Sequence, residues 1–204
     1  GLATEAVRTD LEDLDRRPTV ELVRTLVEAQ TVAQQAVMAA APSLTAAVDA
    51  IAARLAQDGR LFYAGAGTSG RLAILDASEC PPTFNTPPEL VVALIAGGPA
   101  AVTEAIEGAE DSAEAGATDL KARGLKPGDA VVGIAASGRT PYVAGALRYA
   151  REQGCYTAAI VNNSGSVLAG RADYAIDLLT GPEVVAGSTR LWACTAQKIA
   201  VNTL

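Results

Sequence analysis

The sequence predicts an α/β protein with a three-layer, doubly wound, flavodoxin-like fold built on a five-stranded parallel sheet. Two observations carry this prediction: short apolar runs alternate with helical stretches beyond Gly59, and only 4% of the residues are aromatic while aliphatic residues abound. Apolar runs without polar alternation are typical of strands that helices cover on both faces. The predicted strands are residues 61–64, 90–96, 130–135, 157–161 and 174–178.

Helical stretches separate the predicted strands, as parallel pairing requires. They are expected near residues 71–77, 100–123, 142–153 and 166–169. Because ligands of doubly wound sheets bind beyond the carboxyl ends of the strands, the loops after the first and third strands are the candidate binding loops.

The N-terminal region predicts a helical arm ahead of the sheet. Apolar residues recur at helical spacing over residues 18–40, and a second helical pattern covers residues 44–55 before the stop signal Asp58-Gly59. We therefore divide the chain into an arm over residues 1–57 and a sheet domain over residues 58–204.

Composition excludes several classes of function. The net charge of −7 and the lack of any Lys or Arg run argue against nucleic-acid binding. No apolar stretch reaches the roughly 18 residues that cross a bilayer, so we expect no membrane partner and a cytoplasmic protein. The chain has no histidine, and Cys80, Cys155 and Cys194 are far apart, which argues against a metal site or a disulfide. Proton transfer must then fall to Glu, Asp, Lys, Tyr or Cys.

A glycine-rich loop follows the first predicted strand. Gly65, Gly67 and Gly70 satisfy the G-x-G-x-x-G pattern of dinucleotide-binding proteins. That design also needs an acidic residue at the end of the second strand, where this chain has Leu94 to Gly98. The sequence therefore argues against a dinucleotide cofactor.

Both candidate loops carry hydroxyls and end in Ser-Gly-Arg, which favours a phosphate monoester as ligand. Free N–H groups and the helix dipole at a helix N-terminus attract an anion, and Ser or Thr hydroxyls add hydrogen bonds. The alternative is that the hydroxyls only cap helices in tight turns, with Arg71 and Arg139 pointing to solvent. The candidate ligands are Gly67, Thr68, Ser69 and Gly70 in the first loop and Ser137, Gly138, Arg139 and Thr140 in the second.

Longer motifs make the chain similar to a known family. They are residues 65–71 (GAGTSGR), 76–84 (DASECPPTF), 107–111 (EGAED), 133–142 (GIAASGRTPY), 187–190 (GSTR) and 195–198 (TAQK). In these motifs the chain resembles the N-acetylmuramic acid 6-phosphate etherases of the sugar isomerase (SIS) superfamily, and the likeness covers almost the whole chain.

The resemblance implies an enzyme of cell-wall recycling that uses water to cleave the lactyl ether of N-acetylmuramic acid 6-phosphate, giving N-acetylglucosamine 6-phosphate and D-lactate. It implies no cofactor, and a homodimer with its sites at or near the subunit interface. It also implies a helical segment after this chain, in keeping with the uncapped helical pattern from Thr189 to Leu204.

By motif position, the resemblance assigns Glu79 as the general acid and Glu110 as the base that takes the C2 proton. Taken without the family, Glu79 is an ordinary acid near a helix end and Glu110 belongs to a solvated acidic helix face. We expect Cys80-Pro81-Pro82 to form a rigid loop that encloses Glu79. Cys80 itself has no histidine to activate it and is taken as structural.

Ser188 and Thr189 are candidate ligand contacts, with Arg190 beside them, although capping of the last helix explains the two hydroxyls equally well. Trp192 and Cys194 depart from the family, which commonly has lysine and glycine there, and residues 162–166 depart from its usual Cys-Asn-Pro-Gly-Ser. Two rivals remain: a non-catalytic sugar-phosphate sensor resembling the glucokinase regulatory protein, and an aldose-ketose isomerase of the same superfamily.

Overall fold

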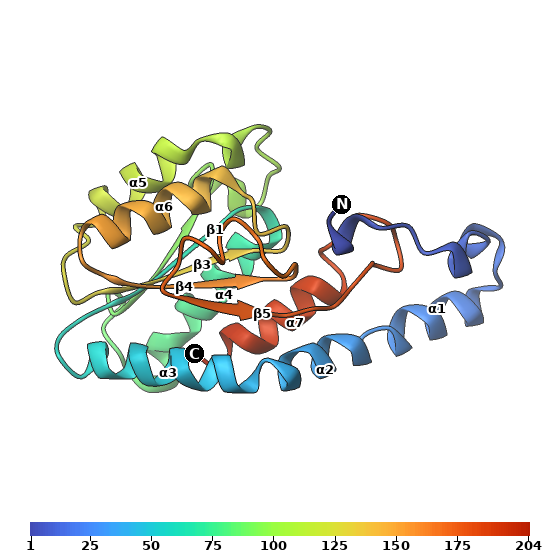
Figure 1. Ribbon diagram of the computed structural model, residues 1–204, viewed down its shortest axis with the longest axis horizontal. Coiled ribbons are helices and arrows are strands. Elements are labelled where there is room, and N and C mark those ends of the chain that lie inside the picture. The colour runs from blue at the N-terminus through green and yellow to red at the C-terminus, as the bar shows by residue number, and fades with distance from the viewer.

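The computed structural model describes residues 1–204 and contains one five-stranded sheet, in the order β2-β1-β3-β4-β5 (Figure 1). Every neighbouring pair of strands is parallel. The strands are β1 (Leu61–Gly65), β2 (Val91–Ile95), β3 (Ala130–Ala135), β4 (Tyr156–Val161) and β5 (Tyr174–Asp177). The predicted fold class is confirmed, and each strand lies where an apolar run predicts one.

Helices cover both faces of the sheet and complete the three layers. The α-helices are α1 (Thr19–Glu28), α2 (Thr31–Ala39), α3 (Ala41–Leu55), α4 (Gly67–Phe84), α5 (Ala113–Ala122), α6 (Pro141–Glu152) and α7 (Trp192–Val201). One core cluster joins α2, α3, α4 and α7 to one face, where Tyr63 of β1 points. The other joins α5 and α6 to the opposite face, where Phe62 points. The side chains of successive strand residues thus pack alternately into two separate cores, as expected for a sheet that helices cover on both faces.

Over residues 18–40 the arm has two short helices, α1 and α2, in place of the single helix that the sequence predicts. Between α1 and α2 the backbone hydrogen bonds tighten to three-residue spacing, from Gln30 N–H to the Val27 carbonyl and from Ala33 N–H to the Gln30 carbonyl. At this point the Gln30 side chain accepts a 2.8 Å hydrogen bond from Thr195 of α7. A tertiary contact therefore accompanies the break.

The arm is unevenly packed against the rest of the protein. α1 buries none of its residues and extends away from the sheet (Figure 1). α3, in contrast, buries Leu44, Ala47 and Ile51 against the sheet. The division of the chain at residue 58 stays a prediction. No single helix is long and apolar enough to cross a membrane; the bent pair Thr19–Ala39 and Ala41–Leu55 passes that test by length and composition only.

The helix after β1 is much longer than the expected 71–77. α4 begins at Gly67 and includes Pro81 and Pro82 in its last turns, so the prediction of a rigid loop there is wrong. Proline removes one N–H donor and distorts a helix, but these two stand near its end. The helix stops at Asn85, which adopts the left-handed conformation and donates its N–H to the Pro81 carbonyl.

The expected helix over residues 100–123 is also wrong in its first half. Two 3-10 turns, η4 (Pro99–Val102) and η5 (Ala109–Asp111), precede α5. α5 begins at Ala113 because the Ser112 side chain caps it, accepting a hydrogen bond from Ala115 N–H. Residues 166–169 form turns rather than a helix. The last helix begins at Trp192, three residues after the expected start at Thr189.

Candidate functional site

The two Ser-Gly-Arg loops leave neighbouring strands at the same edge of the sheet. β1 pairs with β3, with Gly65 opposite Ile134 at their carboxyl ends. From this edge α4 turns to one face and α6 to the other. The loops after β1 and β3 therefore flank the point where the winding of the sheet reverses, where ligands of doubly wound sheets bind.

Close packing explains the glycine spacing in the loop after β1. A side chain at Gly65 would come within 2.8 Å of the Gly70 nitrogen, and one at Gly70 within 2.6 Å of Ile95 Cγ1. Gly67 has a φ of 53°, and nothing lies within 4 Å of the point where its side chain would stand. Two glycines let α4 pack on β1 and β2, and the third leaves open space at the N-terminus of an 18-residue helix. The free N–H groups of this helix end can donate hydrogen bonds to an anion there.

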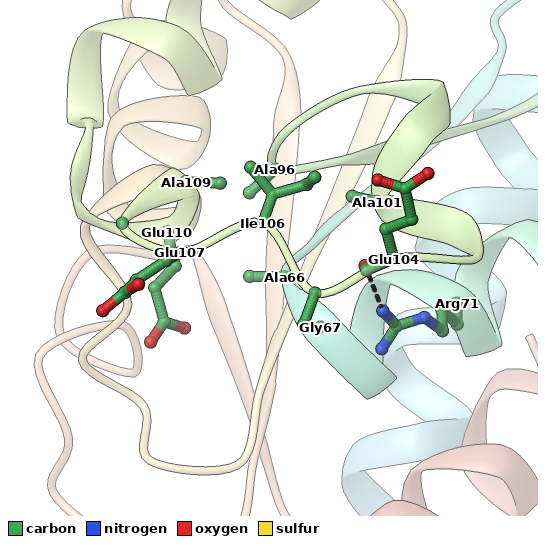
Figure 2. Close-up of a pocket in the computed structure, with 12 residues that line it drawn as sticks. Ala66, Gly67, Arg71, Ala96, Ala101, Glu104, Ile106, Glu107, Ala109 and Glu110 are labelled. Atoms are coloured by element: carbon green, nitrogen blue, oxygen red, sulfur yellow. Dashed lines mark hydrogen bonds between the residues drawn. The ribbon is translucent and has the colours of Figure 1, made fainter.

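A cavity of about 530 Å³ opens directly above Gly67 (Figure 2). One wall is the start of α4, including Ala66, and the other comes from the segment between β2 and α5. Glu107 and Glu110 also line this cavity, and Figure 2 draws both side chains on the segment between β2 and α5. The structure thus places the predicted base Glu110 in the same cavity as Gly67.

Hydrogen bonds from Arg71 join the two walls of this cavity. Its guanidinium donates to the Val102 carbonyl and to the Glu104 carbonyl, both at 2.8 Å; Figure 2 draws the second bond. These bonds join the first turn of α4 to the segment that leads to Glu110. Arg71 is therefore half-buried and bound to backbone carbonyls instead of an acidic side chain, and it positions the cavity wall.

The hydroxyls of the two loops do not cap the helices that follow them. Neither α4 nor α6 has a side-chain capping bond, although Thr140 stands at the capping position of α6. Thr68 is half-buried beside Gly67. Ser137 accepts a 3.2 Å hydrogen bond from Arg139 N–H and so stabilises its own turn. The Thr68 and Thr140 hydroxyls are thus available to a ligand.

The second loop has a backbone that only glycine fits. Gly138 has a φ of 66°, and a side chain on it would overlap Ser166. Arg139 is exposed and lines a separate cavity of about 450 Å³ together with Asn163 and Ser166. Ser137 and Thr140 line neither this cavity nor the one above Gly67.

Ser69 points away from both cavities and into the core. It is only 6% exposed, and its hydroxyl donates a 2.7 Å hydrogen bond to Gln197 Oε1 of α7. Gln197 Nε2 donates to Asn162 Oδ1, whose own amide donates to the Leu178 carbonyl. This buried chain of hydrogen bonds ties α4 to α7 and to the ends of β4 and β5. The hydroxyl of Ser69 is structural here, and a role in ligand binding stays a prediction.

Replacing Ser69 with alanine is expected to destabilise the fold by about 1–3 kcal/mol, because Gln197 Oε1 would lose its hydroxyl donor in the core and keep only the weak 3.6 Å bond from the Cys194 thiol. The change in the free energy of unfolding can be measured by urea denaturation. Ser164→Ala, on an exposed turn, is the matched control and should stay within about 0.5 kcal/mol of the parent. Equal stability of the two variants would contradict the structural role of Ser69.

The segment before α7 contains a residue that the sequence analysis missed. Glu183 is fully buried, and its carboxylate accepts hydrogen bonds from Trp192 N–H and Ala193 N–H, at 3.2 and 3.0 Å. Glu183, and neither Ser188 nor Thr189, is therefore the cap of α7. Burial raises the pKa of Glu183, although the two N–H donors oppose the shift. No sequence motif or spacing marks this carboxylate.

The two departures from the family near α7 lie in the interior. Trp192 and Cys194 are each 4% exposed. The guanidinium of Arg8 lies over the Trp192 ring, 5.7 Å from its centre. The large ring thus occupies buried space beside the N-terminal segment instead of facing either cavity. Arg190 is exposed, and Ser188 and Thr189 are half-exposed.

Glu79 lies far from the cavity that holds Glu110. It stands on the exposed side of α4, twelve positions after Gly67, which corresponds to about 18 Å along a helix. Its neighbours Ala77 and Ser78 line another cavity with Arg60 and Val91, at the amino ends of β1 and β2. One chain alone therefore does not bring Glu79 and Glu110 together.

Comparison with known proteins first defines the class. Residues 43–151 match the glucokinase regulatory protein N-terminal SIS domain family, and residues 110–204 match the SIS domain family. A phosphoheptose isomerase from Francisella tularensis superposes with a TM-score of 0.66, at 17% identity, over 92% of this chain and all of that one. A putative phosphosugar isomerase from Bacteroides fragilis gives 0.68 at 21% identity, over 91% and 87% of the two chains. The protein has a SIS fold.

Sequence relatives then define the family. N-acetylmuramic acid 6-phosphate etherase from Streptomyces avermitilis is 54% identical over 203 residues, which are 100% of this chain and 65% of the relative. The protein of that name from Cronobacter sakazakii is 55% identical, over 99% of this chain and 68% of the relative. The chain belongs to the N-acetylmuramic acid 6-phosphate etherase family, and it spans about two thirds of the length of these relatives.

Proposed function

We propose that this chain is the sugar-phosphate-binding part of an etherase that converts N-acetylmuramic acid 6-phosphate and water into N-acetylglucosamine 6-phosphate and D-lactate. The observation that carries the proposal is the 55% identity to relatives of that name, combined with a cavity that places an acidic residue, Glu110, beside an open helix N-terminus at Gly67. We further propose that the enzyme is a cytoplasmic homodimer that serves peptidoglycan recycling.

The reaction needs one base and one acid, which act at two neighbouring carbon atoms of the sugar. Opening of the sugar ring makes C1 an aldehyde, which acidifies the proton on C2. A base removes that proton, the C3–O bond breaks, and a double bond forms between C2 and C3 while lactate leaves with a proton from the acid. Water then adds across the double bond, so that C3 gains a hydroxyl and C2 regains a proton. A carboxylate and a carboxylic acid meet both needs.

Binding of the phosphate falls to the edge of the sheet where the two Ser-Gly-Arg loops meet. The N–H groups at the start of α4 and the hydroxyls of Thr68 and Thr140 offer hydrogen bonds to its oxygens. In this proposal the sugar extends from the phosphate into the cavity, where Glu110 takes the C2 proton. Glu79 serves as the acid, and Ser188 and Thr189 contact the substrate from the segment before α7.

Two other functions are each favoured by one observation. The match to the glucokinase regulatory protein family favours a sensor that binds a phosphosugar without changing it. The fold shared with phosphoheptose isomerase favours interconversion of aldose and ketose phosphates. An etherase differs from both because it alone releases lactate.

The test is to incubate the full-length protein with N-acetylmuramic acid 6-phosphate and to measure D-lactate with a coupled dehydrogenase assay. We expect one lactate for each N-acetylglucosamine 6-phosphate formed, and none from N-acetylglucosamine 6-phosphate itself, which has no ether. Binding of the substrate in calorimetry without lactate release would favour the sensor, and a ketose phosphate product the isomerase.

A further inference from the structure

The side chain of Asn163 lies between the second Ser-Gly-Arg loop and the N-terminal segment, residues 2–8. Asn163 stands two residues after β4 and is only 6% exposed. Its Nδ2 donates hydrogen bonds to the Ala136 carbonyl and to Thr4 Oγ1, both at 2.9 Å. Its Oδ1 accepts from Ala3 N–H at 2.8 Å and from Thr4 N–H at 3.4 Å. One buried amide thus joins two segments that are far apart in the sequence.

These bonds use the full hydrogen-bonding capacity of the Asn163 side chain. An amide side chain has two N–H donors and one oxygen with two lone pairs. Both donors and both lone pairs are engaged by protein atoms, so the side chain has no group free for a ligand. Asn163 therefore acts on other parts of the protein. Without it, the Thr4 hydroxyl would be buried with no partner, and the Ala136 carbonyl would keep only its 3.1 Å bond from Asn162 N–H.

The bond to the Ala136 carbonyl holds one end of the turn that carries Ser137. At the other end, the Gly138 carbonyl accepts a 3.0 Å hydrogen bond from Leu168 N–H. Residues 136–140 belong to no helix or strand. The two carbonyl bonds therefore determine how the turn lies between β3 and α6, and with it the directions of the Ser137 and Thr140 hydroxyls.

The N-terminal segment also borders the residues before α7. Thr4 is fully buried, and a side chain at Gly187 would come within 3.1 Å of Glu5 Oε2. Ser188 and Thr189, which directly follow Gly187, are proposed to contact the substrate. The N-terminal segment thus lies beside two of the parts to which we assign binding of the phosphosugar.

We infer that Asn163 is a positioning residue of the phosphate site and that, through Thr4, the N-terminal segment is a functional part of that site. The inference rests on the proposed function and adds to it two residues that determine the affinity for the phosphate without touching it. Asn163 acts through the Ala136 carbonyl, which fixes the turn of the second loop. Thr4 acts through Asn163, because its hydroxyl and its N–H fix the orientation of the amide.

The variant Asn163→Ala of the full-length protein tests the inference. Calorimetry measures the Kd of N-acetylglucosamine 6-phosphate, which has no ether to cleave, and the lactate assay gives KM and kcat. We expect Kd and KM to rise about tenfold or more, because a displacement of about 1 Å can cost up to about 10²-fold. The fall in kcat should be much smaller, since contacts to the unreactive phosphate stabilise the bound substrate and the transition state alike.

Two milder variants and one control separate positioning from a general loss of stability. Thr4→Val keeps the shape of the side chain but removes the hydroxyl that Asn163 binds, so its Kd should rise; Thr4→Ser keeps a hydroxyl and should retain most of the affinity. The control is Ile51→Val, which removes buried apolar volume from α3, the helix that leads to the amino end of β1. Its Tm should fall while its Kd stays that of the parent.

Equal Kd values for Asn163→Ala, Thr4→Val and the parent, with a Tm lowered as in Ile51→Val, would overturn the inference. Asn163 would then only attach the N-terminal segment to the fold. Failure of the proposed function gives a different result, because calorimetry needs no turnover. A parent protein that binds N-acetylglucosamine 6-phosphate but releases no lactate would refute the etherase, and the Kd values of the variants would still decide the role of Asn163.

Discussion

Replacing Glu110 with glutamine is expected to reduce kcat for lactate release by about 10²–10⁴-fold, the usual contribution of a positioned general base. Glutamine keeps the size of the side chain but cannot take the C2 proton. Because Glu110 is exposed in the structure, the substitution should not disturb folding. Steady-state kinetics with N-acetylmuramic acid 6-phosphate, together with the Tm of each protein, measure both expectations. KM should change little, because in the proposed mode of binding the phosphate, and not the base, provides most of the affinity.

Glu107→Gln is the matched control for this prediction. Glu107 carries the same carboxylate, lines the same cavity and is exposed like Glu110. We expect a less than tenfold effect on kcat from its replacement, because charge near the site contributes less than the proton transfer itself. A large loss in Glu107→Gln with normal turnover in Glu110→Gln would move the role of base to Glu107.

The sheet could be predicted from the sequence because its central strands, β1, β3 and β4, are buried on both faces. The run around Val131 has no polar residue to confuse its assignment, and the structure leaves all six residues of β3 buried. Helix bounds were less predictable because they depend on contacts between distant residues. The break between α1 and α2 occurs where Gln30 meets Thr195, 165 positions away, and no local signal marks it.

The site was predictable where chemistry follows from position along a strand. The two Ser-Gly-Arg loops were expected at one edge of the sheet, and β1 does pair with β3 there. The direction of a single side chain was not predictable: Ser69 bonds to Gln197 in the core, and Glu183 caps α7 from a loop. The distance between Glu79 and Gly67 could not be predicted, because the sequence indicates only a short helix over residues 71–77. Once α4 is seen to be continuous, counting residues gives that distance.

Replacing Gly145 with alanine is expected to destabilise the protein by about 2 kcal/mol or more and to lower kcat as well. α5 and α6 pack so closely that a methyl group on Gly145 would overlap the backbone carbonyl of Ala113, the first residue of α5. Overpacking typically costs about 1–3 kcal/mol and occasionally more, and a methyl group 1.8 Å from a backbone oxygen belongs at the upper end of that range. The higher helix propensity of alanine returns only about 1 kcal/mol. Relief of the overlap must move the start of α5, and Glu110 lies just before it in η5, which itself contacts α6.

Urea denaturation gives the change in stability, and the lactate assay at saturating substrate gives kcat for the part that remains folded. Gly170→Ala is the control, since its new methyl group would meet the Val167 and Ser166 carbonyls at ordinary distances of 3.7 and 3.9 Å. Its stability should stay within about 0.5 kcal/mol of the parent and its kcat should be unchanged. A Gly145→Ala protein that is destabilised but turns over at the full rate would show that α6 supports the fold without fixing Glu110. We expect a loss of both stability and kcat, because the contact between α5 and α6 stabilises the core and also positions the cavity wall that carries Glu110.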